Sequence, residues 1–187
     1  METDKRREQF IMAALELFAQ KGIARTSIGD ISAKVGVARS LFYHYFPNKV
    51  AIVEAVVDNR VDDFVDQFED WDKDYDPNHT TQSLGDIIAR LRSYIADPDS
   101  FSGIVTREND VILRNQFSIR SAKRLSENYA QRKANTPLEE GHARISHPRE
   151  SLYMLVVGLI SLMIQFPEVT DETLVDVVAE TMHIHLH

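Results

Sequence analysis

Cysteine is absent from all 187 residues, and glycine, proline and tryptophan are scarce, with seven, six and one copies. Without cysteine the chain can form no disulfide framework, no thiolate zinc site and no cysteine nucleophile, and it suits a reducing compartment. The low glycine and proline content excludes collagen-like and low-complexity disordered chains. The content of 43% apolar and 27% charged residues is ordinary for a globular protein. We therefore expect one core or a small domain joined to a larger one.

Long hydrophobic runs are also lacking. The first ten residues, METDKRREQF, contain no apolar segment of the kind a signal peptide needs. The longest apolar stretch, Leu152 to Ile164, is too short to cross a bilayer as a helix. These features predict a soluble cytoplasmic protein with no membrane partner.

Positive charge is scarce overall, with a net charge of -8, but it is unevenly distributed. Residues 1–50 carry eight lysines and arginines against five carboxylates, whereas residues 51–187 carry 13 against 24. Such asymmetry suggests that the N-terminal segment meets a polyanion and that the acidic remainder keeps the protein in solution. Ordinary scatter of surface charge remains the alternative.

Two helices are expected before residue 37. Apolar residues recur at helical spacing over residues 10–18, which predicts a helix over about residues 4–21 with Gly22 as its terminator. Ser27 stands three residues before Asp30, which is a capping-box pattern for a helix of about two turns that ends at Gly36.

A third helix is expected directly after Gly36. The segment ARSLFYHYF, residues 38–46, stops at Pro47, since the residue before a proline avoids helical angles. Two short helices joined at a glycine are typical of a helix-turn-helix, whose second helix enters the major groove of DNA. Arg39 can bond guanine O6 and N7, and tyrosine hydroxyls and Lys49 can reach phosphates.

The remaining sequence is also helical in character. Its expected elements are a long helix from residue 47 or 48, a helix opened by Ser83 and Asp86 and closed before Pro98, two helices within 100–134, a helix over 148–166 and a last helix capped by Thr170 or Asp171. With about nine helices and no strand, the sequence predicts an all-α fold. An N-terminal three-helix domain over residues 1–50 is joined to a larger helical domain over residues 51–187.

The helix over residues 148–166 is apolar on every side, which is unusual for the surface of a monomer. We therefore expect it to pair with its copy, together with the last helix, in a symmetric four-helix interface. The residues predicted for this homodimer interface are Leu152, Leu155, Gly158, Leu159, Leu162, Met163, Phe166, Leu174, Val178 and Met182. A helix internal to one chain is the alternative.

The segment FIMAALELFAQKGIARTSIGDISAKVGVARSLFYHYFPNK resembles the N-terminal pattern of the TetR family of bacterial transcriptional regulators. The resemblance covers about residues 7–57 and implies that the larger domain binds a ligand and makes the dimer. It implies phosphate contacts by Thr26 and Lys49, base contacts by Arg39 and Ser40, and backbone contacts by the tyrosines. The complete expected set of DNA-binding residues is Thr26, Ser27, Arg39, Ser40, Leu41, Tyr43, His44, Tyr45 and Lys49.

Three positions depart from the family pattern. Ala38 stands where a serine often caps the recognition helix, Leu41 replaces a small hydroxyl residue, and Tyr45 replaces a histidine. These departures affect which operator sequence is recognised rather than DNA binding itself.

The resemblance implies a repressor that a small-molecule effector releases from a near-palindromic DNA operator. The residues that could line an effector cavity are Phe64, Phe68, Tyr94, Phe101 and Phe117, and core packing is the alternative for each. The sequence shows no nucleophile–base spacing and no phosphate loop, so we expect no enzyme and no cofactor. His183 and His187 of the final HIHLH would share a helix face, but a frayed terminus is favoured over a metal site. The alternative function is a helical ligand-binding or interaction protein without DNA affinity.

Overall fold

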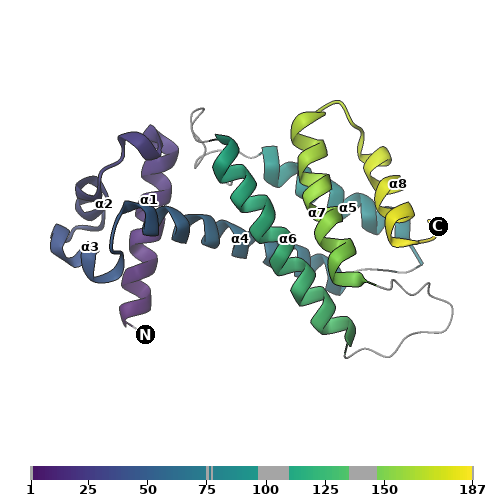
Figure 1. Ribbon diagram of the computed structural model, residues 1–187, viewed down its shortest axis with the longest axis horizontal. Helices are drawn as coiled ribbons and strands as arrows, with labels where there is room; N and C mark the ends of the chain where they lie inside the picture. The colour runs from purple at the N-terminus through teal and green to yellow at the C-terminus, as the bar shows by residue number, and fades with distance from the viewer. Residues whose placement is uncertain (1, 75, 77, 97–109, 135–146, 187) are drawn as a thin grey trace. The chain divides into compact units, whose positions relative to one another are not determined.

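The computed structural model describes residues 2–74, 76, 78–96, 110–134 and 147–186, and over these residues the fold is all-helical, as predicted (Figure 1). The helices are α1 (Glu2–Arg25), α2 (Ile28–Val35), α3 (Arg39–Tyr45), α4 (Lys49–Asp74), α5 (Thr80–Ala96), α6 (Asp110–Ala134), α7 (Pro148–Gln165) and α8 (Asp171–Met182). None of the described helices combines the length and the apolar character that a membrane crossing requires.

The chain divides into two compact units. The first comprises Met1–Asp62 with Ala96–Phe117, and the second comprises Asp63–Ile95 with Ser118–His187. Helices α4 and α6 therefore each contribute residues to both units. The functional division at residue 50 stays a prediction.

Local signals set the ends of the first helices. Gly22 has φ 79° and ψ 158°, so it interrupts the helical backbone near the end of α1, which continues to Arg25 rather than ending at residue 21. The predicted capping box is present, because the Ser27 hydroxyl accepts from the Asp30 N–H and the Asp30 carboxylate accepts from the Ser27 N–H. Gly36 adopts left-handed angles (φ 77°, ψ 32°) and ends α2, which a residue without Cβ does at low cost.

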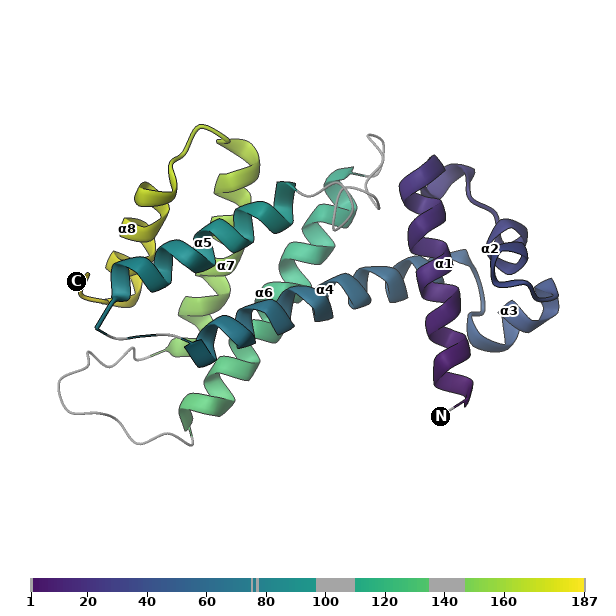
Figure 2. The same cartoon turned by 180° about the vertical axis from the view of Figure 1, so that it is seen from behind.

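An aromatic cluster joins α1 to α3, and Figures 1 and 2 both show α2 and α3 on one side of α1. Phe10 of α1 meets Phe42 of α3 edge to face, with the ring centroids 5.5 Å apart, and Phe46 lies 5.5 Å from Phe42. All three rings are at least 98% buried. Each such side chain contributes about 1.5–3 kcal/mol of burial free energy, so this cluster fixes the orientation of α3.

The second unit contains α5, α7 and α8, and the figures show α7 and α8 side by side. Arg92 of α5 donates from Nε to Asp171 Oδ1 (2.6 Å) and from Nη2 to the Val169 carbonyl (2.7 Å), which ties α5 to the start of α8. The predicted cap at Thr170 is confirmed, since its hydroxyl accepts from the Thr173 N–H at 3.2 Å.

The predicted start of α5 at Ser83 is wrong. The helix begins at Thr80, and Ser83 is a buried residue inside it. Asp76 orders the segment before the helix, because its carboxylate accepts from the N–H and the Nδ2 of Asn78 and contacts His79 Nδ1 at 2.7 Å.

Of the two helices expected within residues 100–134, the structure describes α6. Residues 97–109 and 135–146 lie outside the described residues, so the count of about nine helices stays a prediction.

Candidate DNA-binding site

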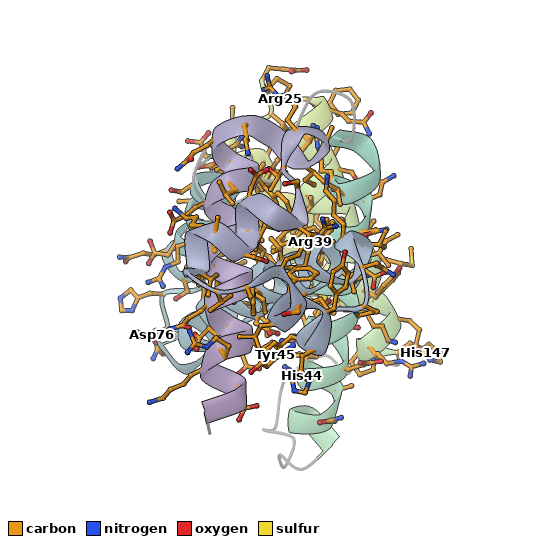
Figure 3. All side chains as sticks on the ribbon, turned by 90° about the vertical axis from the view of Figure 1, so that its left-hand side faces the viewer. Arg25, Arg39, His44, Tyr45, Asp76 and His147 are labelled. Carbon is orange, nitrogen blue, oxygen red and sulfur yellow. The ribbon has the colours of Figure 1, made fainter. Side chains whose placement is uncertain are left out.

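The exposed face of α3 is the candidate site. The left-handed turn at Gly36 redirects the chain, and burial of Phe42 on the inner side of α3 leaves Arg39, Ser40, Tyr43 and His44 exposed on the other sides. In Figure 3, Arg39 lies near the middle of the face formed by α2 and α3, and His44 lies toward the far end of α3. One short helix thus presents a guanidinium, two hydroxyls and an imidazole, all of which can hydrogen-bond to DNA.

Arg39 and Tyr43 contact each other across one helical turn. Arg39 Nη2 donates to the Tyr43 hydroxyl at 2.9 Å, and the Arg39 Cζ lies 5.7 Å from the Tyr43 ring centroid. The Tyr43 ring in turn meets the buried Phe42 ring edge to face at 5.7 Å. The Arg39 guanidinium is therefore hydrogen-bonded within α3 in the absence of DNA.

Leu41 and Tyr45 are less exposed than Arg39 and Tyr43. Both are half-buried, and the Tyr45 ring lies 5.7 Å from the Phe10 ring of α1. Tyr45 also meets the exposed His44 ring edge to face at 5.1 Å. Phe10 of α1 therefore covers part of the Tyr45 ring, and the DNA contacts expected of Leu41 and Tyr45 stay predictions.

Thr26 and Ser27 serve the fold of the helix-turn-helix. Thr26 is 1% exposed, and its hydroxyl donates to the Gly22 carbonyl at 2.8 Å. In this arrangement its side chain cannot reach a phosphate, which corrects the phosphate role expected for it. The Ser27 hydroxyl is hydrogen-bonded to Asp30 in the capping box, so it has a role in the fold. Its expected contact with DNA stays a prediction.

Lys49 lies at the start of α4 and is half-buried. Its Nζ donates to the Ala24 carbonyl at 3.4 Å, near the end of α1. An ammonium group has three donors, so this contact orients the side chain and leaves donors for a phosphate. Arg25, which sequence reasoning did not include, is exposed and is anchored by a 2.8 Å hydrogen bond from Nε to the Lys21 carbonyl.

Two lysines of the N-terminal segment pair with carboxylates. Lys21 Nζ lies 2.8 Å from Asp30 Oδ2, and Lys34 Nζ lies 2.6 Å from Glu16 Oε2. Both pairs join α1 to α2. The charge balance along the sequence could not show these pairs, because they depend on how α1 and α2 pack.

Residues 10–56 match the model of a family described as bacterial regulatory proteins, tetR family. The HTH-type transcriptional regulator YvdT of Bacillus subtilis is 38% identical over 55 residues, which are 29% of this chain and 28% of YvdT. The N-terminal segment of this chain is therefore similar to that of the tetR family of regulatory proteins. The matching proteins are named as transcriptional regulators.

Solved structures extend the likeness to the whole chain at the level of the fold. A TetR-family transcriptional regulator from Mesorhizobium loti is 16% identical with a TM-score of 0.65, covering 98% of this chain and 96% of its own. The multidrug binding protein EbrR complexed with ethidium is 17% identical with a TM-score of 0.61, covering 95% and 98%. At these identities the likeness shows a shared fold. In sequence, the chain spans under a third of the length of the curated relative YvdT.

The residues suggested for an effector cavity lie in apolar surroundings. Phe64, Tyr94 and Phe117 are buried, and the rings of Phe64 and Tyr94 contact each other at 5.5 Å. Phe68 is half-buried, and Phe101 lies outside the described residues. The buried rings are accounted for by core packing, so an effector site at these residues stays a prediction.

The structure separates the predicted dimer residues into two sets. Those already buried within one chain, and therefore removed from the predicted interface, are Leu152, Leu159, Met163, Leu174 and Val178. Those that retain exposed surface are Leu155, Gly158, Leu162, Phe166 and Met182, joined by Met154, which sequence reasoning missed and which is 73% exposed.

Within the described residues, no group of three or more histidines, aspartates or glutamates is placed to hold a metal ion. Helix α8 ends at Met182, and His183 adopts left-handed angles (φ 53°) as its cap. The interpretation in which His183 continues a helix is therefore wrong, and His187 lies outside the described residues.

Proposed function

We propose that the chain is a DNA-binding transcriptional regulator that reads the major groove of B-DNA with α3. The observation that carries the proposal is the exposed polar face of α3 held on a buried aromatic cluster by a glycine turn. The match of residues 10–56 to the TetR family supports it, because that segment contains the whole of α2 and α3.

The side chains divide into proposed roles. Arg39 reads a base edge, and Ser40 and His44 lie beside it on the exposed face of α3. Lys49 contacts a phosphate and so fixes the position of the domain on the duplex. Leu41 and Tyr45 keep partial exposure, which allows contact with a thymine methyl or the DNA backbone at their uncovered edges.

The regulator acts in this proposal as a homodimer. A two-fold axis would place two copies of α3 on half-sites about 34–36 Å apart, one turn of the double helix, so the operator would be near-palindromic. The partly exposed apolar residues of α7 supply the surface for the contact between two copies.

We further propose that a small-molecule effector binds the helical part of the chain and releases it from the operator. The structure that shares this fold and is described as a multidrug binding protein complexed with ethidium supports ligand binding by such a fold. Release requires that the effector bind more tightly to a conformation that does not fit the operator. Repression follows where the operator overlaps a promoter.

The decisive test is the salt dependence of duplex binding by the full chain. Phosphate contacts release counterions, so the logarithm of the association constant should fall linearly with the logarithm of salt concentration. Lys49→Ala removes one phosphate contact and should reduce the magnitude of that slope by about one, whereas Lys123→Ala, an exposed lysine of α6, should leave it unchanged. The measurement is fluorescence anisotropy with labelled duplexes between about 50 and 200 mM salt.

Absence of salt-dependent binding to any duplex would contradict the proposal. That result would favour a helical ligand-binding or interaction protein without DNA affinity. An equal reduction of the slope in Lys49→Ala and Lys123→Ala would contradict the role given to Lys49 alone.

A further inference from the structure

Tyr43 stands out on α3 because its hydroxyl already has a partner. Arg39 Nη2 donates to that hydroxyl at 2.9 Å, and the guanidinium lies beside the Tyr43 ring with its Cζ 5.7 Å from the centroid. Residues four apart on a helix are neighbours on one face, so the contact uses the natural spacing of α3.

The support for Tyr43 extends into the core. Its ring meets Phe42 edge to face at 5.7 Å with an interplanar angle of 88°, and Phe42 is completely buried against Phe10. A ring held at its inner side cannot swing freely, although Tyr43 is 45% exposed. The contact with Phe42 and the hydrogen bond from Arg39 together restrict the position of the Tyr43 hydroxyl.

We infer that Tyr43 is a positioning residue that holds the Arg39 guanidinium for bidentate recognition of one guanine in each operator half-site. This inference rests on the proposed function. It specifies that Arg39 recognises a guanine and that Tyr43 increases the discrimination against other bases. A guanidinium has five N–H donors, so the bond to Tyr43 leaves enough donors for guanine O6 and N7.

Positioning matters because a free arginine side chain samples many rotamers. Binding must then restrict those rotamers at the moment of contact, which weakens the discrimination that the contact can provide. A partner that restricts Arg39 in the unbound protein removes part of that cost. The role differs from a phosphate contact by Tyr43, which would strengthen binding to every sequence equally.

The test begins with duplexes selected from a random pool by the full chain. Each guanine of the selected site is then replaced in turn by 7-deazaguanine, which lacks the N7 acceptor. We expect one guanine per half-site at which this change weakens binding of the parent strongly. Replacing its base pair altogether should cost about five- to 150-fold in affinity, the range for one bidentate contact.

The variants separate positioning from other roles. Arg39→Ala should remove the sensitivity to 7-deazaguanine at that one position, because no donor to N7 remains. Arg39→Lys should reduce this sensitivity only in part, because lysine keeps a donor for N7 but loses the planar fork. Tyr43→Phe keeps the ring and removes the acceptor, so discrimination at the same guanine should fall about two- to tenfold. Tyr153→Phe, the matched removal of a tyrosine hydroxyl on α7 and outside the DNA-binding set, should leave discrimination at that guanine unchanged.

A double-mutant cycle completes the test. Tyr43→Phe should have little further effect on discrimination in the Arg39→Ala background, because its role passes through Arg39. A uniform decrease of affinity in Tyr43→Phe at all sequences, persisting without Arg39, would overturn the inference. So would an Arg39→Ala variant with unchanged sensitivity to 7-deazaguanine. Failure of the parent to bind duplexes at all would instead overturn the proposed function, and circular dichroism melting of each variant shows whether it is folded.

Discussion

The Asp30 carboxylate joins α1 to α2. It accepts from the Ser27 N–H at 2.7 Å and from the Ser27 hydroxyl at 2.8 Å, and it pairs with Lys21 of α1 at 2.8 Å. The hydrogen bond with Lys21 and the two with Ser27 hold the pKa of Asp30 well below its usual range. Removing its charge therefore affects the end of α1 and the start of α2 together.

The depressed pKa of Asp30 makes a prediction about acid stability. A carboxylate with a lower pKa in the folded state stabilises the fold above its unfolded pKa of about 3.9, and that contribution is lost as pH falls below it. Asp30→Asn should therefore lower the urea midpoint at pH 7 and flatten its decline between pH 5 and 3. Asp76 and Glu150 also have lowered pKa values, so part of the decline should remain.

Urea unfolding followed by circular dichroism at pH 7, 5, 4 and 3 measures this effect. Asp66→Asn, which neutralises an exposed carboxylate of α4, is the matched control and should follow the parent. A decline in Asp30→Asn that runs parallel to the parent throughout would show that the Asp30 contacts do not stabilise the folded protein.

At the scale of elements, α2 and α3 are capped very differently. Helix α2 has the Ser27 capping box at one end and Gly36 at the other, whereas α3 has seven residues and begins after Ala38 with no side-chain cap. The recognition helix thus depends on its packing through Phe42 and Phe46 rather than on its own ends.

Ala38→Ser should stabilise the protein by about 0.5–2 kcal/mol, since a serine hydroxyl at this position can accept from an N–H in the first turn of α3. Ala38 already has extended angles (φ -65°, ψ 145°), which suit a capping residue. The free energy of unfolding in urea measures the gain. The control is Ala33→Ser at an exposed position inside α2, which should be slightly destabilising because serine is the poorer helix former. Equal effects at the two positions would contradict capping.

Local chemistry explains which elements the sequence predicted well. Ser27, Gly36, Pro47 and Thr170 act on the backbone within a few residues, so their signals can be read without a tertiary structure. The start of α5 was predicted wrongly for the same reason, because Ser83 and Asp86 have the spacing of a capping box although both lie inside the helix. The true start of α5 lies three residues earlier, where Asp76 orders the chain.

The sequence predicted the exposed residues of α3 correctly. It did not predict which site residues are covered by contacts with α1. Arg39 and Tyr43 are exposed beside the buried Phe42, as expected for residues that contact DNA. Thr26 and Tyr45 are covered by contacts with α1, and no local pattern reports such contacts. The hydrogen bond between Arg39 and Tyr43 could not be predicted from the sequence, because it depends on the conformations of both side chains.

At the scale of the whole molecule, the proposed dimer depends on α7. The sequence shows this helix as apolar on every side, and the structure separates its inner face from an exposed stripe. The stripe contains Met154, Leu155, Gly158, Leu162 and Phe166, which follow one another at helical spacing. A Cβ atom built on Gly158 would meet no atom within 4 Å, so nothing in the described part of the single chain covers this point.

Gly158→Leu should abolish or strongly weaken the dimer without harming the fold. Leucine has the higher helix propensity and finds open space within one chain, but it would hold a partner helix away at the place where glycine permits close approach. Sedimentation equilibrium should give about twice the 21.4 kDa chain mass for the parent at micromolar concentration. The variant should sediment as the single chain or show a dissociation constant raised at least about tenfold.

Gly85→Leu on α5 is the matched control, because Gly85 is also helical with no atom within 4 Å of a built Cβ. It should remain dimeric, since α5 is outside the predicted interface. A Gly158→Leu variant that dimerises as tightly as the parent would remove α7 from the interface. If the variant is monomeric, its affinity for a single half-site should equal that of the parent and its affinity for the palindrome should fall, because only a dimer holds two copies of α3 on one operator.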